Sequence, residues 1–106
     1  MITDDQAEAA ADFIRDHAQK AGHAKATRIY LDEYTKSLRA TLFQQAKAGT
    51  VADKDSYALA HPDYKAHLDG LRAAVEEDER MRWMMVAAEA KLECWRTQSA
   101  NNRRMG

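Results

Sequence analysis

Residues 62–98 read PDYKAHLDGLRAAVEEDERMRWMMVAAEAKLECWRTQ, and this stretch decides the fold. Pro62 suits the first position of a helix, because a missing N–H needs no partner there. The residue before a proline is biased toward extended backbone, so we expect any earlier helix to end by Ala60. Asp63 places a negative charge near the positive end of the helix dipole. No further proline follows, and the stretch therefore predicts one long helix.

Apolar residues recur along this stretch at the spacing of one helix face. The steps are three or four residues, apart from one step of six residues where Asp78 intrudes. A periodic pattern of this length is typical of a coiled coil or an extended hairpin. The stripe consists of Leu68, Leu71, Val75, Met81, Met85, Ala88, Leu92 and Trp95.

The composition indicates an all-α protein. The 106 residues include four glycines and one proline, and no clear apolar–polar alternation predicts a strand. Twenty-one residues are alanine, which favours helices but buries little area. Large apolar residues are too sparse for a deep core in a single small domain. We therefore predict a long antiparallel helical hairpin that forms a coiled-coil-like homo-oligomer or binds a partner protein; the alternative is a marginally stable monomeric hairpin.

Charge alternates along the chain in four blocks, although the formal net charge is only −1. Residues 1–19 hold five acids and one base (−4), residues 20–49 six bases and two acids (+4), residues 50–80 eight acids and four bases (−4), and residues 81–106 five bases and two acids (+3). A fold-back near residue 55 places each block beside one of opposite sign. Each exposed pair adds only ~0.2–1 kcal/mol, so the pattern selects the antiparallel orientation and contributes little stability.

The first half of the chain also reads as a long helix, from about residue 4 to residue 48. Thr3 and Gln6 have the spacing of a capping box. Gly22 either kinks this helix or ends it. Gly49 has the position of a C-terminal cap. Together with residues 62–98, this helix makes a single domain that spans residues 1–106.

A connection over residues 49–61 joins the two helices. Thr50 is expected to cap a short helix over residues 51–60. Tyr57 and Leu59 on that helix are expected to cover the apolar end of the hairpin. Residues 99–106 lack periodicity, and we expect this basic tail to fray.

Two polar residues interrupt the apolar stripes of the two long helices. Arg28 takes an apolar position in the first stripe, and Asp78 takes one in the second. An antiparallel fold-back places Arg28 within about one helical turn of Asp78. Either the two side chains form an ion pair that sets the register, or both extend to solvent.

The residue types that carry catalysis or bind metals do not form a recognisable site in the sequence. The four histidines lack the i, i+4 spacing of a helical metal site with a carboxylate ligand nearby. Cys94 has no histidine placed to activate it. The acidic run at residues 76–79 points around a helix axis and does not converge. We therefore predict a protein that is not an enzyme and has no cofactor and no metal.

Targeting and membrane signals are also missing from the sequence. Met1 is followed by acidic residues where a secretory signal would place an apolar run. No apolar run approaches the ~20 residues that a membrane span needs. The single cysteine fits a reducing compartment. The prediction is a cytoplasmic protein that contacts no membrane.

Basic and aromatic residues alternate on the first long helix. Cations bind phosphates and aromatic rings stack on bases, which is how single-stranded nucleic acid is bound without sequence preference. The alternative is a solvated face of mixed charge. The candidate DNA-binding residues are Tyr30, Tyr34, Lys36 and Arg39 on the helix, and Arg96, Arg103 and Arg104 near the carboxyl end.

Apolar residues on both long helices are the candidates for an interface. Their spacing places them on the stripes that a hairpin or an oligomer buries. The six candidates are Leu38, Leu42, Leu71, Met85, Leu92 and Trp95.

The layout of residues 28–104 resembles small helical phage proteins that are encoded near single-strand annealing or recombinase genes. A helix with Tyr30, Lys36 and Arg39 precedes a turn at Gly49. His61-Pro62-Asp63-Tyr64 then opens a second helix, which closes on Trp95-Arg96-Thr97-Gln98 with trailing Asn and Arg residues. More distantly, the chain is similar to the UvsY type of phage recombination mediator.

The resemblance implies an oligomer that binds single-stranded DNA and helps to load a recombinase in place of a single-strand binding protein. The family contacts DNA through basic residues on a helix before a Gly-containing turn, which correspond here to Lys36 and Arg39. This chain is shorter than the family and slightly acidic. The resemblance thus implies a non-enzymatic recombination accessory protein in the host cytoplasm, with single-stranded DNA and a recombinase or annealing protein as partners. The alternative is a protein-interaction module, such as a phage host-takeover or anti-defence factor.

Overall fold

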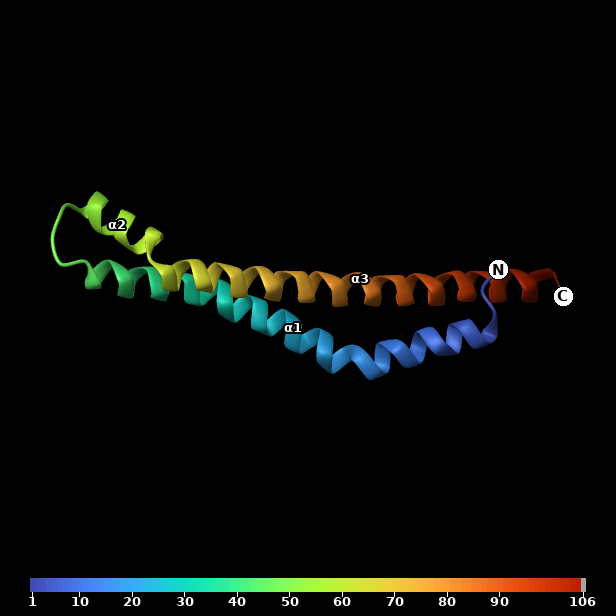
Figure 1. Cartoon of the computed structure of the whole chain (residues 1–106). Coiled ribbons are helices and arrows are strands. Elements are labelled where there is room, and N and C mark those ends of the chain that lie inside the picture. Colours follow the sequence, from blue (N-terminus) through green and yellow to red (C-terminus); the bar gives the residue numbers. More distant parts are fainter. Residues whose placement is uncertain (106) are drawn as a thin grey trace. The chain divides into compact units, whose positions relative to one another are not determined.

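The computed structural model describes residues 1–105, which form three α-helices (Figure 1). The helices are α1 (Asp4–Gln45), α2 (Val51–Ala60) and α3 (Pro62–Met105). Within the described residues there is no strand, and the predicted all-α class is confirmed. None of the described helices combines the length and the apolar composition that crossing a bilayer requires.

Residues of α1 and α3 form two compact units. Unit 1 combines Met1–His23 with residues 79–105, and unit 2 is Ala24–Asp78. The prediction that residues 1–106 form a single domain stays a prediction.

Unit 1 pairs α1 and α3 in opposite directions. The side-chain amide of Gln98 bonds both the N–H and the C=O of Ile2, at 3.0 Å and 2.9 Å. The indole N–H of Trp95 donates to the Asp4 carboxylate at 2.7 Å. As the residue number increases on the amino-terminal side of these contacts, it decreases on α3. The two segments are therefore antiparallel, as predicted.

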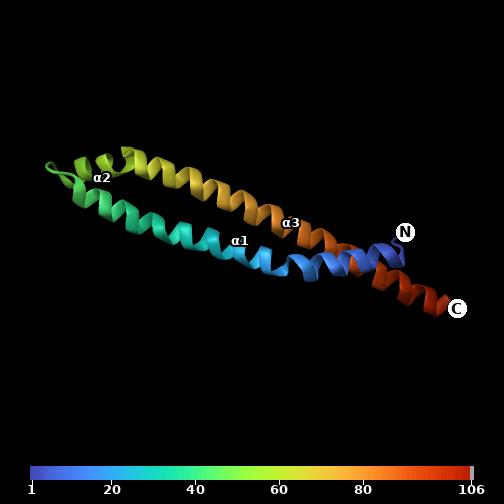
Figure 2. The ribbon, with the colours of Figure 1, turned by 60° about the horizontal axis from the view of Figure 1, so that its bottom comes forward.

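Unit 2 is also an antiparallel pair, and the chain reverses in the loop that precedes α2 (Figure 2). Arg28 contacts Asp78, and the Thr35 hydroxyl lies 2.7 Å from Nε2 of His67. From the first contact to the second, the residue number increases on α1 and decreases on α3, which again makes the two helices antiparallel. Helix α2 lies in the connection between the two long helices.

The helix starts follow local chemistry as predicted. The Thr3 hydroxyl accepts from the Gln6 N–H at 3.1 Å, and the Gln6 side chain accepts from the Thr3 N–H at 2.9 Å. Thr50 and Asp53 form a second capping box, with bonds of 3.1 Å and 3.0 Å. Pro62 is the first residue of α3.

The helix ends differ from the prediction. Helix α1 is continuous through Gly22, which excludes the alternative that Gly22 ends the helix, but it stops at Gln45, before the predicted residue 48. Its end tightens into an i to i−3 bond from the Ala46 N–H to the Phe43 carbonyl, at 3.2 Å, so Gly49 is a loop residue and not the cap.

Helix α3 continues to Met105, so the prediction that the chain frays after residue 98 was wrong. Residues 99–105 contain neither glycine nor proline, and Ser99 and Ala100 are half-buried. Arg103 and Arg104 lie in the last turn, where cations interact favourably with the helix dipole. The final residue of the predicted tail, Gly106, lies outside the described residues.

The buried core of each unit is small. Leu42 in unit 2 and Met81 in unit 1 are the largest fully buried side chains, each 1 % exposed. Most other buried residues are alanines, namely Ala7, Ala10 and Ala88 in unit 1 and Ala24 and Ala58 in unit 2. Helix pairs that meet through alanine approach closely but remove little apolar area from water.

The predicted interface residues are all buried or half-buried within the units. Leu38, Leu42 and Leu71 lie in unit 2, and Met85, Leu92 and Trp95 lie in unit 1. Their role between copies of the chain stays a prediction. Leu68, also predicted for the stripe, is 42 % exposed.

Helix α2 buries a different face from the one expected. Tyr57 and Leu59 were predicted to cover the apolar end of unit 2, yet they are 43 % and 42 % exposed. Ala58 between them is fully buried. A small side chain at the contact lets α2 pack closely, and the two larger side chains are left at the surface.

Of the two alternatives for Arg28 and Asp78, the structure shows the ion pair, with 2.8 Å between Nη1 and Oδ2. The Asp78 side chain is 11 % exposed and the Arg28 side chain 42 %. A carboxylate in this position is costly without a cation, so the pair fixes the register of unit 2.

A double-mutant cycle tests this pair. Arg28→Leu leaves the Asp78 carboxylate buried without the guanidinium, and we expect the free energy of unfolding to fall by about 1–2 kcal/mol. Arg28→Leu combined with Asp78→Leu removes both charges and is expected to recover most of that loss. Urea unfolding followed by circular dichroism measures the coupling, and strictly additive single effects would contradict it.

Gly49 offers a second stability test. Its φ is +118°, and a Cβ there would lie 2.8 Å from Cβ of Asp53. We expect Gly49→Ala to cost about 1–2 kcal/mol in unfolding free energy, because the conformation is strained for L-residues. Gly22→Ala is the matched control, since nothing lies within 4 Å of a Cβ there; mid-helix it is expected to stabilise by about 0.5–1 kcal/mol. Equal changes in unfolding free energy for Gly49→Ala and Gly22→Ala would contradict the claim that the backbone at position 49 is strained for L-residues.

Candidate nucleic-acid interface

A cleft between α1 and α2 of unit 2 combines cations with an aromatic ring. Lys36, Arg39 and Phe43 line it from α1 and Asp55 lines it from α2, in a volume of about 410 Å³. The three α1 residues follow one another at steps of three and four, so they share one helix face. The sequence therefore fixes the α1 wall of the cleft by spacing alone.

Helix α2 places a further cation beside the Phe43 ring that lines the cleft. The Lys54 ammonium lies 5.8 Å from the centre of the Phe43 ring, within cation–π range. The ring itself is half-buried, so its position is fixed by packing while part of its surface meets solvent.

Asp55 moderates the charge of the cleft. Its carboxylate lies 3.6 Å from the Arg39 guanidinium, and both side chains are about half exposed. An exposed pair of this kind is weak, so Arg39 can exchange the carboxylate for another anion. Two cations, Lys36 and Arg39, and one carboxylate leave the lining of the cleft with a surplus of positive charge.

The predicted tyrosines lie on a different flank of α1. At about 100° per residue, Arg39 lies about 140° around the helix from Tyr34. Tyr30 and Tyr34 stack on each other with ring centres 6.2 Å apart, and Tyr34 meets the His67 ring at 5.5 Å. The spacing therefore places Tyr30 and Tyr34 on the side of α1 away from Lys36 and Arg39. Their part in nucleic-acid binding stays a prediction.

The predicted arginines near the carboxyl end belong to unit 1. Arg96 pairs with Glu93 at 3.3 Å. Arg103 and Arg104 are exposed in the last turn of α3. These three residues line no part of the unit 2 cleft.

Sequence reasoning missed Phe43 and Lys54. Phe43 carried a signal, because it follows Arg39 by four positions and shares its helix face. Lys54 carried none, since it comes within reach of Phe43 only when α2 folds back against α1. Among the described residues, no group of three His, Cys, Asp or Glu side chains is placed to hold a metal ion.

Comparison with known proteins identifies no relative: no family model, curated protein or solved structure matches this chain.

Proposed function

We propose that this protein is a non-enzymatic helical accessory protein that contacts single-stranded nucleic acid at the cleft between α1 and α2. The observation that supports the proposal is a cleft lined by Lys36, Arg39 and Phe43, with Lys54 in cation–π contact with the Phe43 ring. Cations along the backbone path with an aromatic ring beside them are the usual equipment of single-strand binding.

Each side chain has a separate part in this contact. Lys36 and Lys54 supply point charges for phosphates. Arg39 exchanges the Asp55 carboxylate for a phosphate, which its planar guanidinium binds through paired N–H groups. Phe43 offers a ring face on which a base can stack. None of these contacts reads base edges, so binding is expected to depend little on sequence.

The biological setting of the proposal is phage DNA recombination in the host cytoplasm. It is supported by the resemblance of residues 28–104 to phage recombination accessory proteins and, distantly, to the UvsY type of mediator. In that setting the protein assists a recombinase or an annealing protein on single-stranded DNA. Lys36 and Arg39 are the residues that correspond to the basic helix of the mediator family.

Binding of a fluorescent oligothymidine strand tests the contact. We expect binding at low ionic strength that weakens steeply with salt, because each phosphate contact releases about one counterion. Lys36→Ala combined with Arg39→Ala is expected to lower the salt slope by about one to two and the affinity by at least tenfold. Fluorescence anisotropy over a salt series measures both quantities.

Matched variants separate the cleft from general charge. Lys25→Ala combined with Lys65→Ala removes the same charge outside the cleft lining and is expected to change affinity by less than about threefold. Asp55→Asn removes the competing carboxylate and is expected to tighten binding. Equal losses for the two lysine-containing pairs, or salt-independent binding, would reject the cleft as the contact surface.

An exposed tryptophan favours a second candidate function, capture of a single protein partner. Trp83 on α3 is 59 % exposed and the nearby Val86 is 42 % exposed. The indole N–H bonds Glu79 at 3.1 Å and the Arg82 guanidinium lies 5.3 Å from the ring, which hold the ring in one orientation. Tryptophan and arginine are the residues most enriched in binding hot spots.

This second function predicts one stoichiometric partner that depends on the indole. Trp83→Ala is expected to abolish capture of that partner while leaving the affinity for oligothymidine unchanged. A pull-down with wild-type and variant protein, read by mass spectrometry, makes the comparison. Capture that survives Trp83→Ala would exclude this surface.

A further inference from the structure

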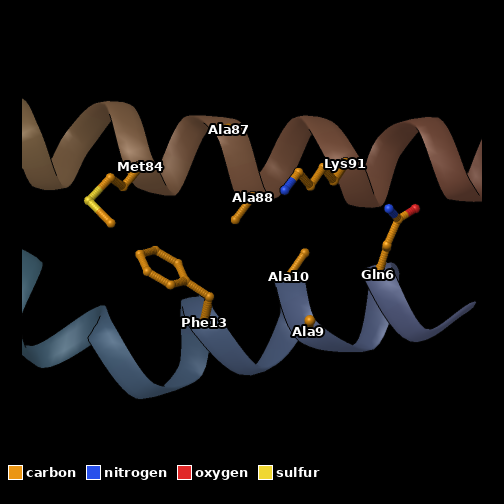
Figure 3. A pocket seen from close by; sticks show the side chains of 8 residues that line it. All are labelled: Gln6, Ala9, Ala10, Phe13, Met84, Ala87, Ala88 and Lys91. Atoms are coloured by element: carbon orange, nitrogen blue, oxygen red, sulfur yellow. The ribbon is translucent and has the colours of Figure 1, made fainter. Parts of the chain in front are cut away.

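Unit 1 carries an apolar groove along the line where α1 and α3 meet (Figure 3). Phe13 and Ala10 line it from α1, and Met84 and Ala88 line it from α3, in a volume of about 380 Å³. Gln6 and Lys91 lie at one end. The Phe13 ring stacks on His17 with ring centres 4.1 Å apart, so the largest apolar side chain of the groove is held in place.

The packing inside unit 1 leaves this groove unfilled. Met81 is the one fully buried large side chain of the unit, and the other buried residues are the alanines Ala7, Ala10 and Ala88. Two helices that meet through alanine bury little apolar area for their length. Met84 remains 38 % exposed at the groove. A second layer of helices on this face would supply the burial that the pair lacks.

The two helices of unit 1 carry opposite charge. Within residues 4–23, α1 holds five carboxylates and two cations, a net −3. Within residues 79–105, α3 holds six cations and three carboxylates, a net +3. Arg15 is already paired with Asp12 at 3.2 Å and Asp16 at 3.1 Å, so the surplus on α1 is negative even after local pairing.

We infer that the groove of unit 1 is filled by the groove of a second copy of this chain. A two-fold axis along the groove places α1 of each copy over α3 of the other, so the −3 and +3 helices face each other. A two-fold axis across the groove would place like charges together. The favoured axis brings Phe13 of one copy against Met84 of its partner, an aromatic–thioether contact. The result is an antiparallel four-helix bundle.

This partner choice follows from self-complementarity. A partner for the groove must supply an apolar surface, with net positive charge beside α1 and net negative charge beside α3. The α1–α3 pair of another copy supplies all three, and an isologous interface needs only one patch to do so. The inference stands apart from nucleic-acid contact, which was assigned to unit 2.

Two alanines on α1 provide a matched test. Ala9 lines the groove, whereas Ala11 lies about 160° around the helix; both are exposed. We expect the full chain to sediment at twice its 12.0 kDa mass at tens of micromolar. Ala9→Lys is expected to weaken the dimer by at least tenfold, because it places an ammonium in the apolar contact and against the partner's Lys91. Ala11→Lys is expected to leave the dimer unchanged.

Cysteine cross-linking then fixes the axis. In a Cys94→Ser background, Ala9→Cys and Lys91→Cys chains are prepared separately and mixed under mild oxidation. The axis along the groove predicts a disulfide between position 9 of one copy and position 91 of the other, and none in either preparation alone.

Each outcome decides between the alternatives. A dimer that is lost with Ala9→Lys and kept with Ala11→Lys, with unchanged helical circular dichroism, supports the inference. A monomeric wild-type chain, or equal effects of the two substitutions, overturns it. Cross-links from position 9 to position 9 would replace the proposed axis by the one across the groove, and would thus refute the charge argument.

Discussion

The Asp78 carboxylate constrains unit 2 more than any other group. It is buried on α3 and lies 2.8 Å from the Arg28 guanidinium on α1. Leu42 is the one large side chain fully buried in this unit, so apolar packing alone selects among sliding positions only weakly. A buried carboxylate tolerates no sliding, because any other register removes its cation. The register of α1 against α3 in unit 2 is therefore set by the Arg28–Asp78 ion pair. The small alanine side chains determine how closely the two helices approach.

In unit 1 the register of α1 against α3 is set by neutral and charge-assisted hydrogen bonds. Gln98 bonds both backbone groups of Ile2, and Trp95 donates to Asp4. These contacts sit at the outer end of the helix pair, where the amino terminus would otherwise fray. The two units thus share an antiparallel layout but specify it with different chemistry. This difference also explains why the groove of unit 1 stays open: its polar contacts align the helices without filling the space beside Phe13 and Met84.

Sequence reasoning succeeded where the cause is local. The caps at Thr3 and Thr50 and the start at Pro62 depend on a few neighbouring residues, and the Arg28–Asp78 pair was visible as two misfits in otherwise apolar stripes. Sequence reasoning failed where a contact depends on how two helices pack against each other. Whether Tyr57 or Ala58 faces the core depends on how α2 approaches, and Lys54 meets Phe43 only after the chain reverses. The helix beyond residue 98 was missed because its polar residues carry no periodic signal, although nothing in them stops a helix.

The cleft between α1 and α2 has an unusual origin for a binding surface. Every side chain that forms it comes from one continuous run, residues 36–55, closed by the Gly49 turn and the Thr50–Asp53 capping box. The residues of the cleft are thus close together in the sequence, as those of a turn motif are. The cleft does not depend on contacts between distant parts of the chain. Substitutions elsewhere in unit 2 can change the cleft only by changing the stability of α1 and α2. The rest of the sequence can therefore vary while the residues of the cleft stay the same.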